Sequence, residues 1–287
     1  MTQPTLQQPI ILLGTHRSGT TFLGSVLQQH PDVAYWEEPR HVWVWHNANT
    51  PDDHLSANHA RPEVINHIHR AFRDHIHEQN KPRFAEKTPS NCLRLDFINA
   101  VFPDARYIHI YRDGRAVVRS TLEMLASSSP DTSQVINKLK QTPLRDWPSF
   151  ASRAWHTLAK RLLGKPMSFW GPRPPGWKDW VAKHPPHVVL AKQWVHSVEA
   201  PLAFKSQIPS DRWIDLRYEE LVQKPSLLVA QALQTANLPP SLSVDEFVTS
   251  RADASRKDKW RDELAPTTLD DLKPAMLPTL QKLGYDW

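Results

Sequence analysis

Short apolar runs alternate with longer amphipathic segments along most of the chain. The short runs have the length of buried strands and lie at residues 9–14, 33–36, 83–87, 106–111 and 212–217. Helix-like patterns lie between and after them, at residues 22–30, 61–79, 149–163, 187–207 and 225–236 and directly after residue 112. Strands that alternate with helices favour a parallel sheet with helices on both faces. The pattern therefore predicts an α/β fold, a three-layer sandwich with a central parallel sheet.

The first apolar run stops at a glycine and is followed by a polar loop and a helix. In this context the N–H groups of the loop and of the helix N-terminus form a binding site for an anion. The spacing Gly14-x4-Gly19 is that of a Walker A loop, but Thr20 stands where the lysine should follow, and the cation is inside the loop as Arg17. The loop therefore keeps the phosphate cradle and lacks the lysine that binds a triphosphate.

A second arginine follows the strand predicted at 106–111. Arg112 is expected at the carboxyl end of a parallel strand, where open α/β sheets bind their ligands. Ser120 lies two helical turns further on and on the same side of the predicted helix. A guanidinium and a hydroxyl together suit a phosphate group, so this stretch predicts a second anion site.

Composition and charge exclude several classes of protein. The 287 residues carry 35 Lys+Arg against 30 Asp+Glu, a net charge of +5, which is a small excess for a nucleic-acid-binding stripe. Cys92 is the single cysteine, so the chain has no internal disulfide and no multi-cysteine metal site. Four histidines of segment 61–79 lack the i, i+4 spacing of a zinc pair, and we expect no metal; they are His67, His69, His75 and His77.

The chain shows no apolar run of the length that crosses a bilayer, about 20 residues. Residues 1–9 combine neither a basic start nor an apolar run. We therefore expect neither a membrane span nor a signal peptide, and a cytoplasmic protein.

The two anion motifs together resemble those of the sulfotransferases that use 3′-phosphoadenosine-5′-phosphosulfate. Residues 15–21 are similar to their 5′-phosphosulfate loop, and Arg112 with Ser120 is similar to their 3′-phosphate motif. His30-Pro31, the pair Glu37-Glu38 and segment 216–221 extend the likeness to the tyrosylprotein-sulfotransferase-like and related bacterial enzymes. The resemblance implies a P-loop-like sulfotransferase fold and a metal-independent, in-line transfer of a sulfuryl group from this donor to a hydroxyl or amine.

The resemblance also implies a role for each matching residue. The 5′-phosphate would be held by the loop amides of Ser18, Gly19, Thr20 and Thr21, and the 3′-phosphate by Arg112 and Ser120. Arg17 would contact the bridging and sulfuryl oxygens, and Lys87, at a strand end, would stabilise the leaving sulfuryl oxygens. Tyr218 would lie near the nucleotide, and a late basic loop would close over it with Arg256 and Lys259.

Glu38 is the candidate general base of the reaction. It follows the strand predicted at 33–36, and the resemblance aligns it with the catalytic glutamate of the subgroup. Adjacent carboxylates on an extended segment point opposite ways, so we expect only one of Glu37 and Glu38 to face the acceptor. His16 and His41 are alternative bases, and Arg40 is expected either to steer the acceptor or to hold Glu38 ionised.

One proline- and tryptophan-rich segment, residues 164–186, interrupts the regular alternation. Its six prolines exclude a continuous helix or strand, and its three tryptophans argue against a flexible linker. We expect a single domain, residues 1–287, with this segment as an ordered excursion. Trp170, Trp177 and Trp180 either stack on a ring of the acceptor or fasten the loop to the domain.

The expected function is sulfuryl transfer to a hydroxyl of a carbohydrate, lipid or small molecule. Peptide tyrosine ranks below these, because the peptide-modifying members of the family work in secretory compartments. A P-loop nucleotide-dependent kinase is the first alternative, although the Walker lysine is missing. The second is a non-catalytic nucleic-acid binder, which the net charge of +5 would support.

Overall fold

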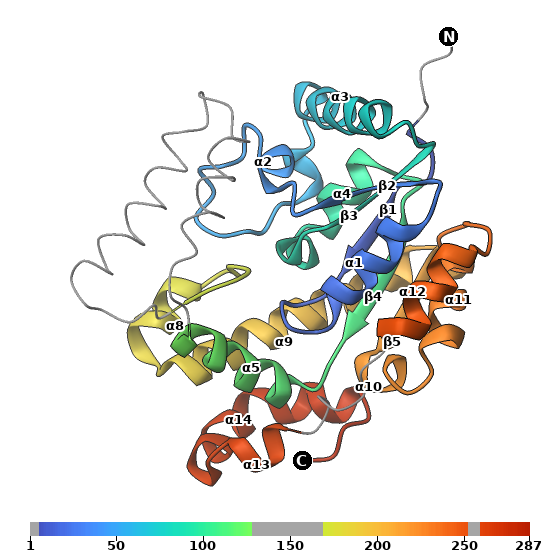
Figure 1. Ribbon diagram of the computed structural model, residues 1–287. Helices are drawn as coiled ribbons and strands as arrows, with labels where there is room; N and C mark the ends of the chain where they lie inside the picture. Colours follow the sequence, from blue (N-terminus) through green and yellow to red (C-terminus); the bar gives the residue numbers. More distant parts are fainter. Residues whose placement is uncertain (1–5, 128–168, 252–258) are drawn as a thin grey trace.

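A parallel sheet of five strands forms the centre of the computed structural model, which describes residues 6–127, 169–251 and 259–287 (Figure 1). The strands are β1 (Ile10–Leu13), β2 (Val33–Glu37), β3 (Arg83–Lys87), β4 (Arg106–Tyr111) and β5 (Trp213–Arg217). They pair in the order β2-β3-β1-β4-β5, and every pairing is parallel. The five predicted strands and the predicted three-layer α/β architecture are confirmed.

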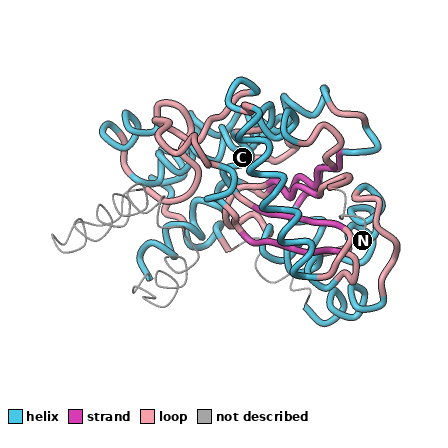
Figure 2. The backbone as a smooth tube through the Cα atoms, turned by 90° about the horizontal axis from the view of Figure 1, so that it is seen from above, coloured by secondary structure: helices cyan, strands magenta, loops and turns pink. Residues whose placement is uncertain are grey.

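Helices surround the sheet and make up most of the regular structure in the described residues (Figure 2). The α-helices are α1 (Thr20–Gln29), α2 (Arg40–Trp43), α3 (Pro62–Gln79), α4 (Leu95–Val101), α5 (Gly114–Ser127), α8 (Trp177–Lys183), α9 (Pro186–Phe204), α10 (Tyr218–Leu221), α11 (Pro225–Thr235), α12 (Leu242–Arg251), α13 (Trp260–Glu263) and α14 (Pro266–Lys282). The short 3₁₀ helices are η1 (Ala57–His59), η2 (Pro89–Leu93), η4 (Lys205–Gln207) and η5 (Ser210–Arg212).

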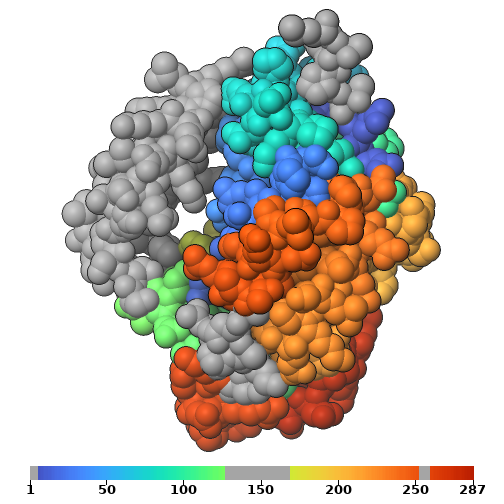
Figure 3. Space-filling view, turned by 45° about the vertical axis from the view of Figure 1, so that its right-hand side comes forward, coloured from blue at the N-terminus to red at the C-terminus, as the bar shows by residue number. Residues whose placement is uncertain are grey.

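The two faces of the sheet bury different helices because successive strand residues point to opposite sides. Ile11 and Leu13 belong to a core with α3 and α4, whereas Ile10 and Leu12 belong to a core with α1, α11 and α12. A third cluster joins α5, α9, α13 and α14. In the space-filling view, the teal residues of α3, the orange residues of α11 and α12 and the red residues of α14 follow one another down one face (Figure 3).

Helix boundaries follow the local sequence. Gly19, at the N-cap of α1, has φ 98°, a left-handed value that favours glycine. The helix predicted over 61–79 is observed at Pro62–Gln79, with proline in its first turn, and it ends at Asn80 with φ 51°. The segment predicted as irregular contains a short helix, α8, after the loop at 169–176. The helix predicted at 149–163 lies outside the described residues.

No helix among the described residues has both the length and the apolar character that a membrane-spanning helix requires.

Gly14 is expected to be intolerant of a side chain. An added Cβ would lie 2.7 Å from the Ile110 carbonyl oxygen and 2.7 Å from Cγ2 of Thr20, and the Ile110 carbonyl belongs to a central strand that cannot move freely. Gly14→Ala should lower the free energy of unfolding by about 2 kcal/mol in chemical denaturation. Gln28→Ala, at an exposed position of α1, is the control. Equal stability of the two variants would contradict this account of the loop.

Candidate active site

The candidate residues come from the ends of all five strands. Because the strands are parallel, their carboxyl ends meet at one edge of the sheet, where α/β proteins bind ligands. In the spatial order of the strands, this edge carries Glu38 after β2, Lys87 at the end of β3, the loop at 14–19 after β1, Arg112 after β4 and Tyr218 after β5. The sequence places these residues far apart, and the sheet brings them together.

The loop after β1 has the backbone conformation of an anion cradle. Arg17 and Gly19 have φ values of 63° and 98°, which turn the chain tightly before α1. Ser18 is fully buried, and its hydroxyl donates to the Thr15 carbonyl oxygen at 2.6 Å. A Cβ on Gly19 would lie 2.6 Å from the ring of Tyr218, so the ring covers the loop closely. The amides at 18–21 thus lie at the N-terminus of a helix whose first turn has no acidic residue.

The two predicted anion motifs meet in space. Nε of Arg17 donates to Oγ of Ser120 at 2.9 Å, across 103 residues of sequence. A terminal nitrogen of Arg112 donates to the Arg17 carbonyl oxygen at 3.2 Å, across 95 residues. The Arg112 guanidinium also lies over the Tyr218 ring, 4.3 Å from its centroid. Arg112, Ser120 and Tyr218 therefore surround the loop that carries Arg17.

Burial and the neighbouring charge of Arg17 lower the pKa of Arg112, although nearby acidic groups oppose the shift. A buried cation of this kind gains stability when an anion binds beside it, since the anion replaces lost hydration. The electrostatics of this corner favour a phosphate as its ligand.

Lys87, at the end of β3, lies between the loop after β1 and the two acidic residues at the end of β2. Its Nζ lies 2.8 Å from a carboxylate oxygen of Glu38 and 3.1 Å from one of Glu37, and the Lys87 side chain is 4% exposed. Burial opposes the charge on Lys87, but the two carboxylates outweigh this effect and raise its pKa. Lys87 therefore remains an ammonium at this edge.

The expected opposite orientation of Glu37 and Glu38 is wrong. Both carboxylates reach Lys87, because Glu38 has φ 52° and breaks the alternation of the strand. The Glu38 amide donates to the Lys87 carbonyl oxygen at 2.9 Å, which fixes this turn against β3. Glu38 makes the shorter contact to Lys87 and is the less exposed of the two, at 38% against 56% for the side chains.

The alternative bases lie in different surroundings. His16 is buried, and burial together with Arg17 lowers its pKa to about 3, so the ring is neutral near pH 7. Neither ring nitrogen of His16 has a hydrogen-bond partner among the described residues. The His16 and Trp170 rings pack edge to face, with their centroids 4.8 Å apart. His41 lies beside Trp36, with ring centroids 5.8 Å apart. Of the three candidate bases, Glu38 is the one that the structure shows paired with Lys87.

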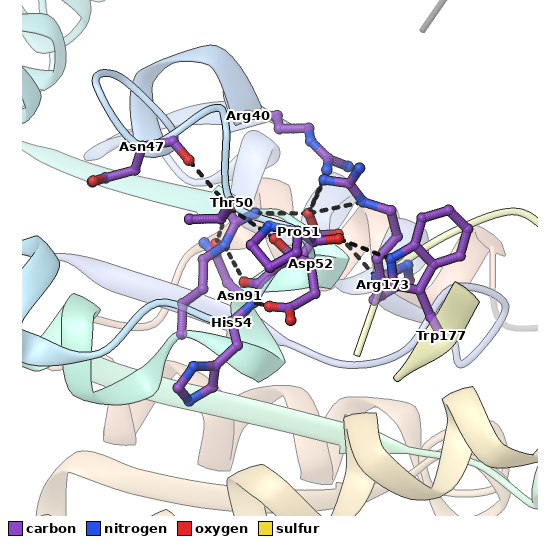
Figure 4. A network of polar contacts seen from close by, with 12 residues as sticks. Arg40, Asn47, Thr50, Pro51, Asp52, His54, Asn91, Arg173 and Trp177 are labelled. Atoms are coloured by element: carbon purple, nitrogen blue, oxygen red, sulfur yellow. Dashed lines mark hydrogen bonds and ion pairs between the residues drawn. The ribbon is translucent and has the colours of Figure 1, made fainter. Parts of the chain in front are cut away.

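Arg40 pairs with an aspartate that the sequence analysis did not single out. Asp53 accepts contacts from Arg40 at 2.6 Å, Arg173 at 2.7 Å and Arg94 at 3.5 Å, and its side chain is 1% exposed. Burial would raise the pKa of Asp53, but the three guanidiniums outweigh it and hold the pKa at about 2. Figure 4 shows Arg40 and Arg173 directed toward the loop that carries Asp52. Arg40 is therefore paired with Asp53. Burial lowers the pKa of Arg40, and the Glu38 carboxylate is among the groups that oppose this shift.

Two of the three tryptophans of the excursion fasten it to the domain. Nε1 of Trp177 donates to the Pro51 carbonyl oxygen at 3.0 Å, and the Trp180 ring lies 5.0 Å from that of His196 on α9. Trp170 differs, because its ring rests on His16 and is 37% exposed. Amide hydrogens of the Gln193 side chain hold this loop by donating to two carbonyl oxygens, at residues 170 and 172.

Two further predicted positions lie near residue 260. Arg256 is outside the described residues, whereas Lys259 is exposed and directly precedes α13. No cluster of three or more His, Cys, Asp or Glu side chains suited to a metal ion occurs in the described ranges.

Comparison with known proteins gives the family. Residues 9–169 match the model described as the sulfotransferase family, which is more than half of the chain. The chain belongs to the sulfotransferase family. It is 31% identical to protein-tyrosine sulfotransferase A of Caenorhabditis elegans over 96% of this chain and 67% of that protein. It is 25% identical to human protein-tyrosine sulfotransferase 1 over 97% and 70% of the two chains.

The fold is likewise that of a sulfotransferase. The sulfotransferase domain from the curacin biosynthetic pathway superposes with a TM-score of 0.60 at 17% identity, covering 98% of this chain and 99% of that domain. The family match and the identity to protein-tyrosine sulfotransferase A confirm the predicted enzyme class. Membership in this family also favours the sulfotransferase interpretation over the kinase and nucleic-acid alternatives.

A buried glutamate next to Lys87 was missed by the sequence analysis. Glu86 accepts hydrogen bonds from Nε1 of Trp43 at 3.1 Å, Oγ1 of Thr88 at 2.8 Å and Nδ2 of Asn91 at 2.8 Å. Burial nevertheless raises its pKa from 4.5 to about 7. The strand pattern at 83–87 gave no signal that this carboxylate is buried and bonded to two nearby side chains, Thr88 and Asn91, and to the distant Trp43.

Glu86 should make stability depend on pH. Because its folded pKa of about 7 exceeds the ordinary value of 4.5, the folded protein binds a proton that the unfolded chain releases within this window. Its contribution to the free energy of unfolding should fall by about 1 to 3 kcal/mol as pH rises through the window. Denaturation of wild type and Glu86→Gln between pH 4.5 and 7.5 measures this difference, with the exposed Glu78→Gln as the control. Parallel pH profiles for wild type and Glu86→Gln would contradict it.

Proposed function

We propose that this protein transfers the sulfuryl group of 3′-phosphoadenosine-5′-phosphosulfate to an acceptor hydroxyl. The observation that carries the proposal is the convergence of Arg17, Arg112, Ser120 and Tyr218 on the glycine loop. A donor with phosphates at both the 5′ and the 3′ position suits a site with two adjacent anion motifs. The loop amides at 18–21 take the 5′-phosphate, Arg112 and Ser120 take the 3′-phosphate, and the Tyr218 ring lies beside the nucleotide.

In this proposal the chemistry takes place at the Glu38–Lys87 pair. The Glu38 carboxylate accepts the proton of the acceptor hydroxyl while its oxygen bonds to sulfur, and the bond from sulfur to the bridging phosphate oxygen breaks. Charge that develops on the sulfuryl and bridging oxygens is stabilised by Lys87, Arg17 and the loop amides. The contact of 2.8 Å between Glu38 and Lys87 supports this arrangement, because it holds the base and the cation side by side. The mechanism uses no metal.

The acceptor is proposed at the level of a hydroxyl group. The sequence alone ranked carbohydrate, lipid and small-molecule hydroxyls ahead of peptide tyrosine. Two relatives that align over nearly the whole chain are named as protein-tyrosine sulfotransferases, and this supports a phenolic hydroxyl as the first acceptor to test.

Arg112→Ala should abolish most of the affinity for the product nucleotide. Calorimetry with adenosine 3′,5′-bisphosphate should show metal-independent binding to wild type and a loss of about 100-fold in the variant, because a buried phosphate contact is removed. Arg119→Ala is the matched control, since Arg119 lies on the same helix and pairs with Glu123 and Glu263 at the surface. If wild type binds ATP with Mg²⁺ and not the bisphosphate, the donor assignment fails.

Glu38→Gln should lower kcat by at least about 100-fold and leave the affinity for adenosine 3′,5′-bisphosphate unchanged, because the variant keeps the size of the side chain and loses the base. Transfer of labelled sulfate to a phenolic acceptor measures kcat. Glu37→Gln, the matched substitution at the neighbouring carboxylate, should have a much smaller effect. A reversed ranking of the two variants would assign the base to Glu37.

A further inference from the structure

One carboxylate connects the ends of β4 and β5 just behind the proposed 3′-phosphate site. Oε1 of Glu219 accepts a hydrogen bond from the Asp113 amide at 3.1 Å, and Oε2 accepts one from the Tyr285 hydroxyl at 2.7 Å. Asp113 directly follows Arg112, and Glu219 directly follows Tyr218. Glu219 therefore ties together the backbone next to the two residues that face the nucleotide in the proposed site.

Arg112 itself is held from several sides. Its carbonyl oxygen accepts a hydrogen bond from Nε1 of Trp194 at 3.1 Å, and its guanidinium lies over the Tyr218 ring. Trp194 is a buried residue of α9, so this contact has little freedom to move. With the hydrogen bond from the Asp113 amide to Glu219, these contacts set both the backbone and the direction of the Arg112 side chain.

The segment that supplies Tyr285 is itself clamped. Arg115 pairs with both carboxylate oxygens of Asp113, at 3.0 and 2.8 Å, and donates to the Asp286 carbonyl oxygen at 2.6 Å. Its guanidinium lies 4.0 Å from the ring centroid of Trp260 and 5.1 Å from that of Trp287. Tyr285 is thus fixed to the same turn, 112–115, that carries the phosphate-binding arginine.

Glu219 is close enough to Arg112 to interact with it electrostatically. It is among the groups that raise the pKa of Arg112 against the effect of burial. A carboxylate so near would compete with a phosphate for the guanidinium if it turned toward it. The Tyr285 hydroxyl opposes this turn by holding Oε2. Arg217 supports it, since its Nε lies 3.7 Å from the same oxygen and its guanidinium lies 3.8 Å from the centroid of the Tyr285 ring. Burial and Glu219 raise the pKa of Tyr285, so the phenol keeps its proton and acts as the donor.

We propose that Tyr285 is a positioning residue that holds Glu219 and so keeps this carboxylate from competing with the 3′-phosphate of the nucleotide for Arg112. The inference rests on the proposed function, because it takes Arg112 as the 3′-phosphate ligand. It assigns to Tyr285–Trp287 a role in selecting nucleotides that carry a 3′-phosphate over those that lack it.

The test compares two nucleotides on full-length Tyr285→Phe. Calorimetry should show about a tenfold loss of affinity for adenosine 3′,5′-bisphosphate, the usual effect of removing a hydrogen bond to a charged group. Adenosine 5′-phosphate, which makes no 3′ contact, should bind the variant and wild type alike. Tyr107→Phe is the matched control, because it removes a buried hydroxyl that has no hydrogen-bond partner among the described residues. This control should change neither affinity.

A double variant tests whether Tyr285 acts through Glu219. In Glu219→Gln the competing charge is gone, so adding Tyr285→Phe should change the preference for the 3′-phosphorylated nucleotide less than twofold. Equal weakening of both nucleotides by Tyr285→Phe, with a lowered Tm, would reduce Tyr285 to a stabilising residue and overturn the proposal. No change in either affinity would overturn it as well. If wild type itself does not prefer the bisphosphate, the proposed function fails first.

Discussion

Parallel pairing of five strands is the constraint on which the rest of the molecule depends. It forces every strand to end at the same edge, so each strand can contribute one functional group to a common site. β2 contributes Glu38, β3 Lys87, β4 Arg112 and β5 Tyr218, and the strand between β3 and β4 contributes the loop. The order of the strands thereby separates the half of the edge that carries Glu37 and Glu38 from the half that carries Arg112 and Tyr218, with the loop between them.

Charge at this edge is balanced by pairs that differ in strength and burial. Lys87 is held by two partly exposed carboxylates, whereas Arg112 is buried next to another arginine. Asp53 pairs with Arg40 together with two further guanidiniums. Arg17 and Arg112 lie together at the loop, and a bound anion would stabilise these two neighbouring cations. This distribution supports the proposed placement of the donor over β1, β4 and β5.

The strands and the two anion motifs could be predicted from the sequence because they depend on local patterns. Apolar runs of strand length and a glycine before a helix keep their meaning wherever the chain goes. The orientation of Glu38 could not be predicted in this way, since its φ of 52° departs from the extended backbone that the pattern implies. The contacts of Asp53 and Tyr285 also lay beyond the sequence, because their partners Arg173 and Glu219 are brought to them only by the folded chain.

A crystal structure of the protein with adenosine 3′,5′-bisphosphate tests the central claim most directly. The account predicts the 3′-phosphate within hydrogen-bond distance of Arg112 and Ser120, and the 5′-phosphate on the amides of residues 18–21. Lys87 and Glu38 should then lie beside the 5′-phosphate, where the sulfuryl group would be in the donor. A nucleotide bound away from this edge, or with its 3′-phosphate distant from Arg112, would contradict the account.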